Sequence, residues 1–257
     1  MTDWPRVDII VVTYDRIDEF SGTVKALTDK IDYPQAKLRI LVADDFSPGD
    51  YLDRLWRRAL RYPQEVGIKC ETVPADQNVG WGANVNRALR YSDAPYILQI
   101  EDDYILRKDL DLCAAVACME VVSHIGMLRF RGTAGDYLVY HQQEANISKW
   151  LPDYQDGVGL PGRLSYLLID GGSPGLYLYS HGLHLKRANF HNFYGQYPEG
   201  LRLGHTEESY AHTVKDKMRA NPYAPVLCIQ PAWIPLWLDH IGKSYQLGPL
   251  DIERTTV

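Results

Sequence analysis

Four short apolar runs, each followed by a stretch with helical spacing, constrain the fold more than any other feature of this sequence. The runs lie at 7–12, 38–42, 68–73 and 96–100, and the helical stretches lie at 18–31, 51–61, 82–91 and 110–123. Continuous apolar strands are typical of a parallel sheet that helices cover on both faces, since neither strand face then meets water. The first half therefore predicts a Rossmann-like, mostly parallel α/β sheet.

The pattern changes after about residue 126. Short strand-like runs follow, and helical spacing predicts helices at 185–193 and 207–219; the runs are GMLRFRG, YLVYH, SYLLID, GLYLYSHG and PVLCIQP. The segment LPDYQDGVGLPGR is rich in Gly, Pro and Asp, which is typical of a surface loop or lid. No repeat or linker divides the chain. We therefore expect one domain over 1–257, whose second part is a smaller mixed region.

Composition narrows the classes of function. The 257 residues are 46% hydrophobic and 23% charged, which is enough for one large core. The net charge of −6 and the lack of any Lys/Arg-rich run argue against nucleic acid as a partner. The apolar run at the N-terminus is too short for a signal sequence or a transmembrane segment. We therefore expect a cytoplasmic protein, in solution or peripheral at a membrane.

Three adjacent carboxylates, Glu101, Asp102 and Asp103, close the fourth apolar run in YILQIEDDYIL. Like charges at this spacing repel one another, and each needs a positive partner or a proton when it is partly buried. A helix cap needs only one carboxylate, whereas an adjacent trio at a strand end suits a hard divalent cation such as Mg²⁺ or Mn²⁺. Because ligands bind outside the carboxyl ends of parallel strands, we expect a ligand site at this edge.

The other strand ends are also polar, with the sequences TYDR, DDFSPGD and DQNVGWGANVN. Each has a purely structural interpretation as well. Asp44 and Asp45, ahead of Ser47, suit a turn and a helix cap, and Asn78 with Gly80 suits a turn before a helix. Taken alone, none of these three segments indicates a function.

Taken in order, the segments VVTYDR, ILVADDFSPGD, NVGWGANVNRAL and YILQIEDD resemble the nucleotide-sugar half of family 2 glycosyltransferases, which are inverting enzymes with the GT-A fold. The resemblance covers about residues 7–103 and continues more loosely through LYSHGLHLKRANFHNFYGQYPEGLRLGHTEES. It implies a single GT-A domain, with a nucleotide-sugar-binding half at 1–105 and an acceptor-binding half at 106–257.

The resemblance also implies the reaction and its partners. A sugar would pass from a nucleoside diphosphate sugar, of the UDP or dTDP type, to a hydroxyl acceptor. The acceptor would be a glycan, a lipid-linked compound, a protein or a small molecule, and Mn²⁺ or Mg²⁺ would bind the diphosphate. Breaking the sugar–phosphate bond leaves negative charge on the departing diphosphate, which a bound cation stabilises.

By the same resemblance, a set of residues contacts the donor. Base and ribose are assigned to Thr13, Tyr14 and Arg16; the base to Asp44 or Asp45; the nucleotide and phosphates to Asn78, Gly80 and Gly82; and the ribose to Asp102. Asp103 matches the metal ligand of the DxD motif, and His240 matches a C-terminal histidine that completes the metal shell. Glu101 replaces the usual first aspartate of that motif, which leaves its role open.

The acceptor hydroxyl must lose its proton as it attacks, and a positioned carboxylate can take this proton as a general base. The best candidates are Glu207 and Glu208 in GHTEESYAH, at the start of a predicted helix. The family's acidic pair places the base at its second member, which is Glu208 here. Both members are glutamates where the family usually has Glu-Asp, so Glu207 remains an alternative.

Two other functions are compatible with the same residues. A nucleotidyltransferase would use a similar core and an acidic metal site, but no Gly-rich, basic phosphate loop follows the first strand, where TYDRIDEF is acidic. A non-catalytic sugar-nucleotide-binding protein would keep the pocket without turnover. The retained acidic trio and the Glu207–Glu208 pair argue against that loss.

Overall fold

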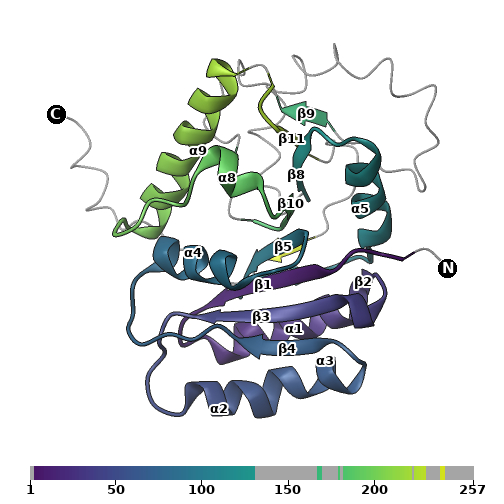
Figure 1. The fold of residues 1–257 in the computed structure, drawn as a ribbon. Helices are drawn as coiled ribbons and strands as arrows, with labels where there is room; N and C mark the ends of the chain where they lie inside the picture. Colours follow the sequence, from purple (N-terminus) through teal and green to yellow (C-terminus); the bar gives the residue numbers. More distant parts are fainter. Residues whose placement is uncertain are drawn as a thin grey trace.

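The computed structural model describes residues 3–130, 167–169, 179, 182–221, 223–229 and 238–240. Within these residues, eight strands form one sheet: β1 (Val7–Thr13), β3 (Leu38–Asp44), β4 (Lys69–Thr72), β5 (Tyr96–Glu101), β8 (Ile125–Arg129), β9 (Leu167–Ile169), β10 (His184–Arg187) and β11 (Val226–Ile229). Their order across the sheet is β4-β3-β1-β5-β10-β8-β11-β9 (Figure 1). The segment LPDYQDGVGLPGR, predicted to be a loop or lid, lies outside the described residues.

The four predicted apolar runs form four adjacent parallel strands of this sheet. β1 lies between β3 and β5, with Val7 opposite Leu38 and Tyr96, and β4 extends the sheet beyond β3. Alternate residues of β1 face opposite sides, since Ile9 packs in one core cluster and Ile10 in the other. Both faces of β1 are therefore buried, which explains why it is apolar from Ile9 to Val12.

Helices cover both faces of the sheet. One face packs against α1 (Ile17–Lys30), α2 (Tyr51–Leu55), α3 (Arg61–Glu65) and α5 (Leu112–Val121), and the other against α4 (Trp81–Tyr91), α8 (Phe190–Tyr194) and α9 (Leu203–Ala220). A π-helical turn at Trp56–Leu60 joins α2 to α3, so the helix predicted at 51–61 continues to Glu65. Among the described residues, none of these helices is long and apolar enough to cross a membrane.

The helix predicted at 185–193 is wrong over its first part. Leu185 and its neighbours form β10, which runs antiparallel between β5 and β8, and only Phe190–Tyr194 is helical. The side chains of His184 and Lys186 are fully buried on one face of the sheet, while Leu185 is buried on the other. Residues 183–186 alternate apolar and polar as a strand does, but a run of four residues is too short to distinguish a strand from a helix by its period.

Two small sheets flank the main one. β6 (Tyr104–Leu106) pairs antiparallel with β12 (Leu238–His240), and β2 (Ile31–Asp32) pairs with β7 (Leu110–Asp111), while a short 3₁₀ turn occupies Gln35–Lys37. The backbone of His240 lies opposite that of Tyr104, the residue that follows Asp103. The C-terminal strand is therefore next to the acidic trio.

Candidate active site

The polar strand ends come together at one edge of the sheet, as the sequence predicts. Thr13 at the end of β1 lies opposite Asp44 at the end of β3, and Val12 lies opposite Glu101 at the end of β5. Backbone hydrogen bonds continue past the strands, because the N–H of Asp45 donates to the Thr13 carbonyl at 3.1 Å. The loops that leave these strands are therefore held side by side.

Asp102 and Asp103 converge on one positive charge. The Arg16 Nη1 atom donates to Asp102 Oδ1 and to Asp103 Oδ2, both at 2.8 Å. The two carboxylates are only 2% and 4% exposed. Burial raises the pKa of Asp102 to about 6, although the Arg16 guanidinium opposes this shift. Arg16 thus supplies the positive partner that the sequence demands.

The backbone around this pair is fixed by its neighbours. The N–H of Asp102 donates to the Val12 carbonyl at 3.1 Å, and the Thr23 hydroxyl of α1 donates to the Asp102 carbonyl at 2.6 Å. The hydroxyls of Thr13 and Tyr51 share a buried hydrogen bond of 2.8 Å beside them. Thr23 and Tyr51 were not predicted from the sequence, because they approach the site from helices distant along the chain.

Glu101 interacts with its two acidic neighbours and with an acidic residue of α9. Burial raises the pKa of Glu101 to about 8, and the charges of Asp103, Glu207 and Asp102 add to the shift. Glu207 of α9 is therefore close enough to act on Glu101 and is partly buried, whereas Glu208 is exposed. Because α9 begins at Leu203, both glutamates lie one turn further into the helix than predicted.

Asp44 and Asp45 have different surroundings. The two oxygens of Asp45 accept the backbone N–H groups of Val79 and Gly80, at 2.9 and 2.8 Å. Asp45 therefore holds the loop that leads into α4. The carboxylate of Asp44 accepts the N–H of Ser47 at 2.9 Å and also its hydroxyl. Burial raises the pKa of Asp44.

Asp44 also lines a cavity of about 450 Å³ at the carboxyl ends of β3 and β4. Its lining residues come from the segments that follow these two strands and are Asp44, Phe46, Ser47, Pro48, Gly49, Asp50, Leu52, Asp53, Thr72, Val73, Pro74 and Ala75. The charged members are all aspartates. A cavity of this composition favours groups that donate hydrogen bonds and disfavours phosphate.

The predicted residues that lead into α4 divide into two groups. Asn78 is exposed, and Gly80 precedes α4 with a φ of 81°, a conformation that favours glycine. Gly82 is buried, and a Cβ placed on it would lie 2.2 Å from the Pro198 carbonyl oxygen. Close packing against the second half of the chain therefore accounts for Gly82, which the sequence did not indicate.

A buried group of polar residues around Lys186 of β10 was not predicted from the sequence. The buried amine of Lys186 lies 2.6 Å from Gln99 Oε1, 2.8 Å from His191 Nε2 and 3.2 Å from the Tyr197 hydroxyl. Burial lowers the pKa of both Lys186 and His191. The amide of Gln99 inside the apolar run YILQIE was the one available signal, because a buried amide needs polar partners.

The donor set at Asp102 and Asp103 fits a divalent metal ion. The two carboxylate oxygens meet at one cation position, which the Arg16 nitrogen takes. Among the described residues, no group of three or more His, Cys, Asp or Glu side chains is gathered around a point. Mg²⁺ is commonly held by one or two carboxylates together with substrate phosphates, so a pair is sufficient for this kind of site. The side chain of His240 lies outside the described part of the chain.

Comparison with known proteins identifies relatives of this chain. The model of the family "Glycosyl transferase family 2" matches residues 8–164. A cellulose synthase catalytic subunit (UDP-forming) from Pseudomonas fluorescens strain SBW25 is 27% identical over 104 residues, which are 40% of this chain and 13% of that protein. This chain therefore matches only a small part of that relative.

Solved structures share the fold. S. aureus TarS superposes with a TM-score of 0.61 at 16% identity, over 92% of this chain and 37% of TarS. TarS 1–349 in complex with UDP-GlcNAc superposes with a TM-score of 0.61 at 15% identity, over 98% of this chain and 62% of that chain. The mannosyltransferase PcManGT from Pyrobaculum calidifontis, in complex with GDP-Man and Mn²⁺, superposes with a TM-score of 0.56 at 16% identity. The superposition covers 90% of this chain and 58% of PcManGT. The predicted GT-A-type fold is confirmed by these structures.

Proposed function

Because the chain belongs to glycosyltransferase family 2, we propose that it is an inverting enzyme that moves a sugar from a nucleoside diphosphate sugar of the UDP or dTDP type to a hydroxyl acceptor. Beyond the family match, the proposal rests on one observation. Asp102 and Asp103 present two buried carboxylate oxygens to a single cation position at the end of β5, on the same sheet edge as the acid-lined cavity after β3 and β4. Such an edge suits a donor whose diphosphate is bound through a cation.

Asp103 and Asp102 would hold Mn²⁺ or Mg²⁺, with His240 as a further ligand. The pairing of β12 with β6 supports His240, because its backbone lies opposite Tyr104. The Mn²⁺ in the PcManGT complex supports a divalent ion in this fold. Such an ion stabilises the negative charge that develops on the departing diphosphate. In this structure Arg16 forms ion pairs with both carboxylates.

The remaining residues have separate tasks. Thr13, Tyr14 and Asp44 line the edge where base and ribose would bind, and Tyr14 is 48% exposed there. Glu207 or Glu208 would accept the proton of the acceptor hydroxyl as it attacks the anomeric carbon, opposite the leaving diphosphate. Within this pair the partial burial of Glu207 near Glu101 favours Glu207 as the base. One attack from the face opposite the leaving group inverts the anomeric configuration.

The product released from the donor tests the reaction. The protein is incubated with UDP-sugars, dTDP-sugars and GDP-mannose in the presence of Mn²⁺, with sugar alcohols as acceptors, and the nucleotide products are separated by chromatography. We expect release of nucleoside diphosphate from at least one donor. Release of pyrophosphate would indicate a nucleotidyltransferase, and binding of donor without any product would indicate a binding protein.

The Asp103→Asn variant tests the cation position. We expect Mn²⁺-stimulated release of nucleoside diphosphate to fall about 100-fold or more, because the loss of one metal ligand weakens several kcal/mol of charge stabilisation. Thermal stabilisation by UDP plus Mn²⁺ should be lost as well. The matched control is Asp216→Asn, an exposed aspartate on α9, which should behave as the unaltered protein. Full activity of Asp103→Asn would refute the metal assignment.

A further inference from the structure

Phe46 combines two unfavourable features at the edge of the cavity. Its φ is 63°, a left-handed conformation that side chains other than glycine rarely adopt, and its ring is 52% exposed to water. It also lines the cavity that contains Asp44. A large apolar side chain in a strained and exposed position needs a reason, and such strain is concentrated at ligand sites.

The surrounding loop enforces this conformation. The residues on either side of Phe46 are both anchored, since Asp45 binds the N–H groups of Val79 and Gly80, and Ser47 is bound to Asp44. The Ser47 hydroxyl also accepts the N–H of Asp15 at 2.8 Å. In the described part of the chain, Asp15 is the other non-glycine residue with a positive φ, at 49°. The loops after β1 and β3 are thus locked together, and Phe46 is held outward between its anchors.

The cavity beside the ring selects the kind of ligand. Its charged lining residues are Asp44, Asp50 and Asp53, so an anionic phosphate is repelled while hydrogen-bond donors are attracted. The phosphates of a donor would instead reach the Arg16 side of the edge, where the cation position lies. A planar group with N–H donors on its rim and a π-face suits both the aspartates and the exposed ring. The nucleobase is the part of a nucleotide sugar with these properties.

We propose that Phe46 provides a stacking face for the nucleobase of the donor and that the locked loop holds this face in position before the donor binds. The inference rests on the proposed function, because it assigns a further base-contacting residue to the same donor. Stacking of a base on an aromatic ring accounts for about tenfold or more in affinity.

Three substitutions separate stacking from structure. Phe46→Gly removes the ring and accepts the positive φ without strain, so the melting temperature should stay the same or rise. Phe46→Leu keeps an apolar side chain without a π-face. We expect both variants to bind UDP about tenfold or more weakly in the presence of Mn²⁺, measured by calorimetry. Phe46→Tyr keeps the ring and should bind UDP within about twofold of the unaltered protein.

Pyrophosphate with Mn²⁺ serves as the ligand without a base, and its affinity should be equal in all four proteins. The Tyr223→Ala variant, which removes a ring that is 91% exposed elsewhere, should bind UDP normally. Equal UDP affinity of Phe46→Gly, Phe46→Leu and the unaltered protein would overturn the stacking role of Phe46 but not the proposed function. Failure of the unaltered protein to bind UDP, dTDP or GDP would overturn the proposed function and this inference together.

Discussion

A single guanidinium determines the electrostatics of the strand-end edge. Asp102 and Asp103 are adjacent in sequence and buried, so their charges repel at short range, and both are within 2.8 Å of one Arg16 nitrogen. The carboxylates in turn raise the pKa of Arg16, although burial alone would lower it. The protein thus holds two acceptors around one point of positive charge, which is the arrangement that a small divalent ion requires.

The two glutamates of α9 should differ in their effect on turnover. We expect Glu207→Gln to lower the turnover number by about 10² to 10⁴, the usual scale for loss of a general base, with UDP affinity unchanged. Glu208→Gln should lower it less than threefold, because Glu208 is exposed, whereas Glu207 is partly buried and its charge acts on Glu101. Steady-state assays of nucleoside diphosphate release give both numbers. The reverse order would make Glu208 the base, and two small effects would place the base outside this pair.

For neighbouring acidic residues, the sequence predicted where they lie but not which of them is available to a ligand. The strand-end rule located Asp44, Asp45 and the acidic trio at one edge, and the structure brings them together there. The sequence left open which aspartate was available, since Asp45 is occupied by Val79 and Gly80, more than 30 residues further along the chain. Contacts over that distance depend on how a loop folds back, which no local pattern records.

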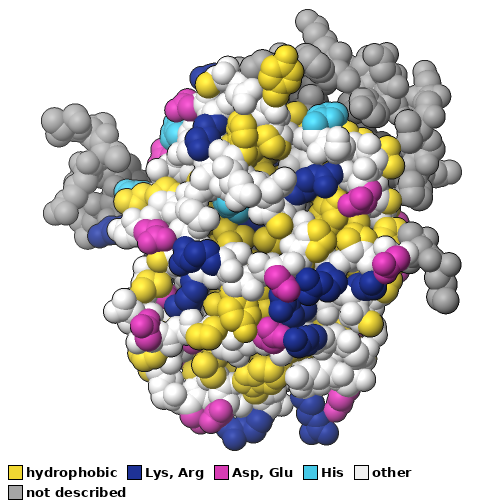
Figure 2. All heavy atoms as spheres, in the orientation of Figure 1, with side chains coloured by type: hydrophobic (Ala, Val, Ile, Leu, Met, Phe, Trp, Pro, Cys, Tyr) yellow, Lys and Arg dark blue, Asp and Glu magenta, His cyan; other side chains and the backbone are white. Residues whose placement is uncertain are grey.

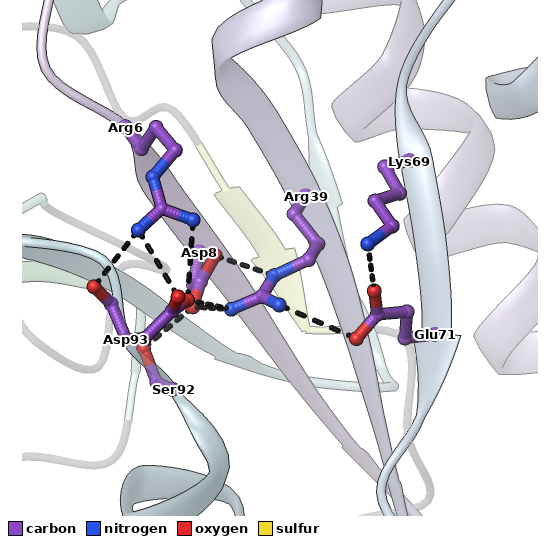
Figure 3. A network of polar contacts seen from close by, with 7 residues as sticks. All are labelled: Arg6, Asp8, Arg39, Lys69, Glu71, Ser92 and Asp93. Carbon is purple, nitrogen blue, oxygen red and sulfur yellow. Dashed lines mark hydrogen bonds and ion pairs between the residues drawn. The ribbon is translucent and has the colours of Figure 1, made fainter.

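At the level of elements, the amino ends of the strands carry their own polar network, away from the site. Asp8 of β1 lies opposite Arg39 of β3, and the guanidinium binds both Asp8 oxygens, at 2.9 and 2.6 Å (Figure 3). Arg39 also contacts Glu71 and Asp93, and the Ser92 hydroxyl donates to Asp8. Asp8 is 1% exposed, and a charge buried this deeply is stable only because these partners bind it.

Removal of Asp8 should destabilise the fold without affecting the site. We expect Asp8→Ala to lower the free energy of unfolding by about 3 kcal/mol, because it leaves the mostly buried Arg39 guanidinium without its main partner. Urea unfolding measures this change. The control is Arg6→Ala, which breaks an exposed pair with Asp93 and should cost under about 1 kcal/mol. Both folded variants should bind UDP normally, and weaker binding would show that the network acts on the opposite edge.

The same elements show why the fold was easier to predict in one half than in the other. The first four runs are short but mostly apolar, and each forms a strand within two residues of its predicted bounds. β10 failed because His184 and Lys186 are buried by polar partners, so a central strand looks like part of a polar helix. The alternation at 183–186 spans only four residues, and its polar members look exposed in the sequence although they are buried.

Across the whole molecule, α4 joins the parallel strands of the first half of the chain to the half that carries α9. Figure 1 shows α4 between the parallel strands and α9, and in Figure 2 basic and acidic side chains are interspersed over the same view. The Asn86 amide donates to the Tyr197 carbonyl at 2.9 Å and to Glu199 at 2.8 Å, and Asn86 accepts the Tyr197 N–H at 3.0 Å. One buried asparagine thus fixes the segment that leads into α9.

Gly82 allows the two halves to approach closely enough for the site to form. A Cβ on Gly82 would lie 2.2 Å from the Pro198 carbonyl oxygen and 3.3 Å from the Thr206 methyl group, next to Glu207. Because both contacts belong to the second half, Gly82→Ala should displace the backbone at Pro198, just before α9, and press on α9 itself at Thr206. We expect a loss of about 1–3 kcal/mol in the free energy of unfolding, as for other overpacked cores. Turnover should fall further than UDP affinity, since Glu207 moves while the donor edge stays.

Gly204→Ala is the matched control for this prediction, because it adds the same methyl group to the first turn of α9, where a Cβ would meet nothing within 4 Å. Alanine favours a helix over glycine by about 1 kcal/mol, so this variant should be as stable as the unaltered protein or more so. Urea unfolding and turnover are measured on both variants. Equal turnover in Gly82→Ala and Gly204→Ala would mean that Glu207 is not positioned through α4. A parallel loss of UDP binding and turnover in Gly82→Ala would mean that Gly82 belongs to the donor site itself, as the sequence first indicated.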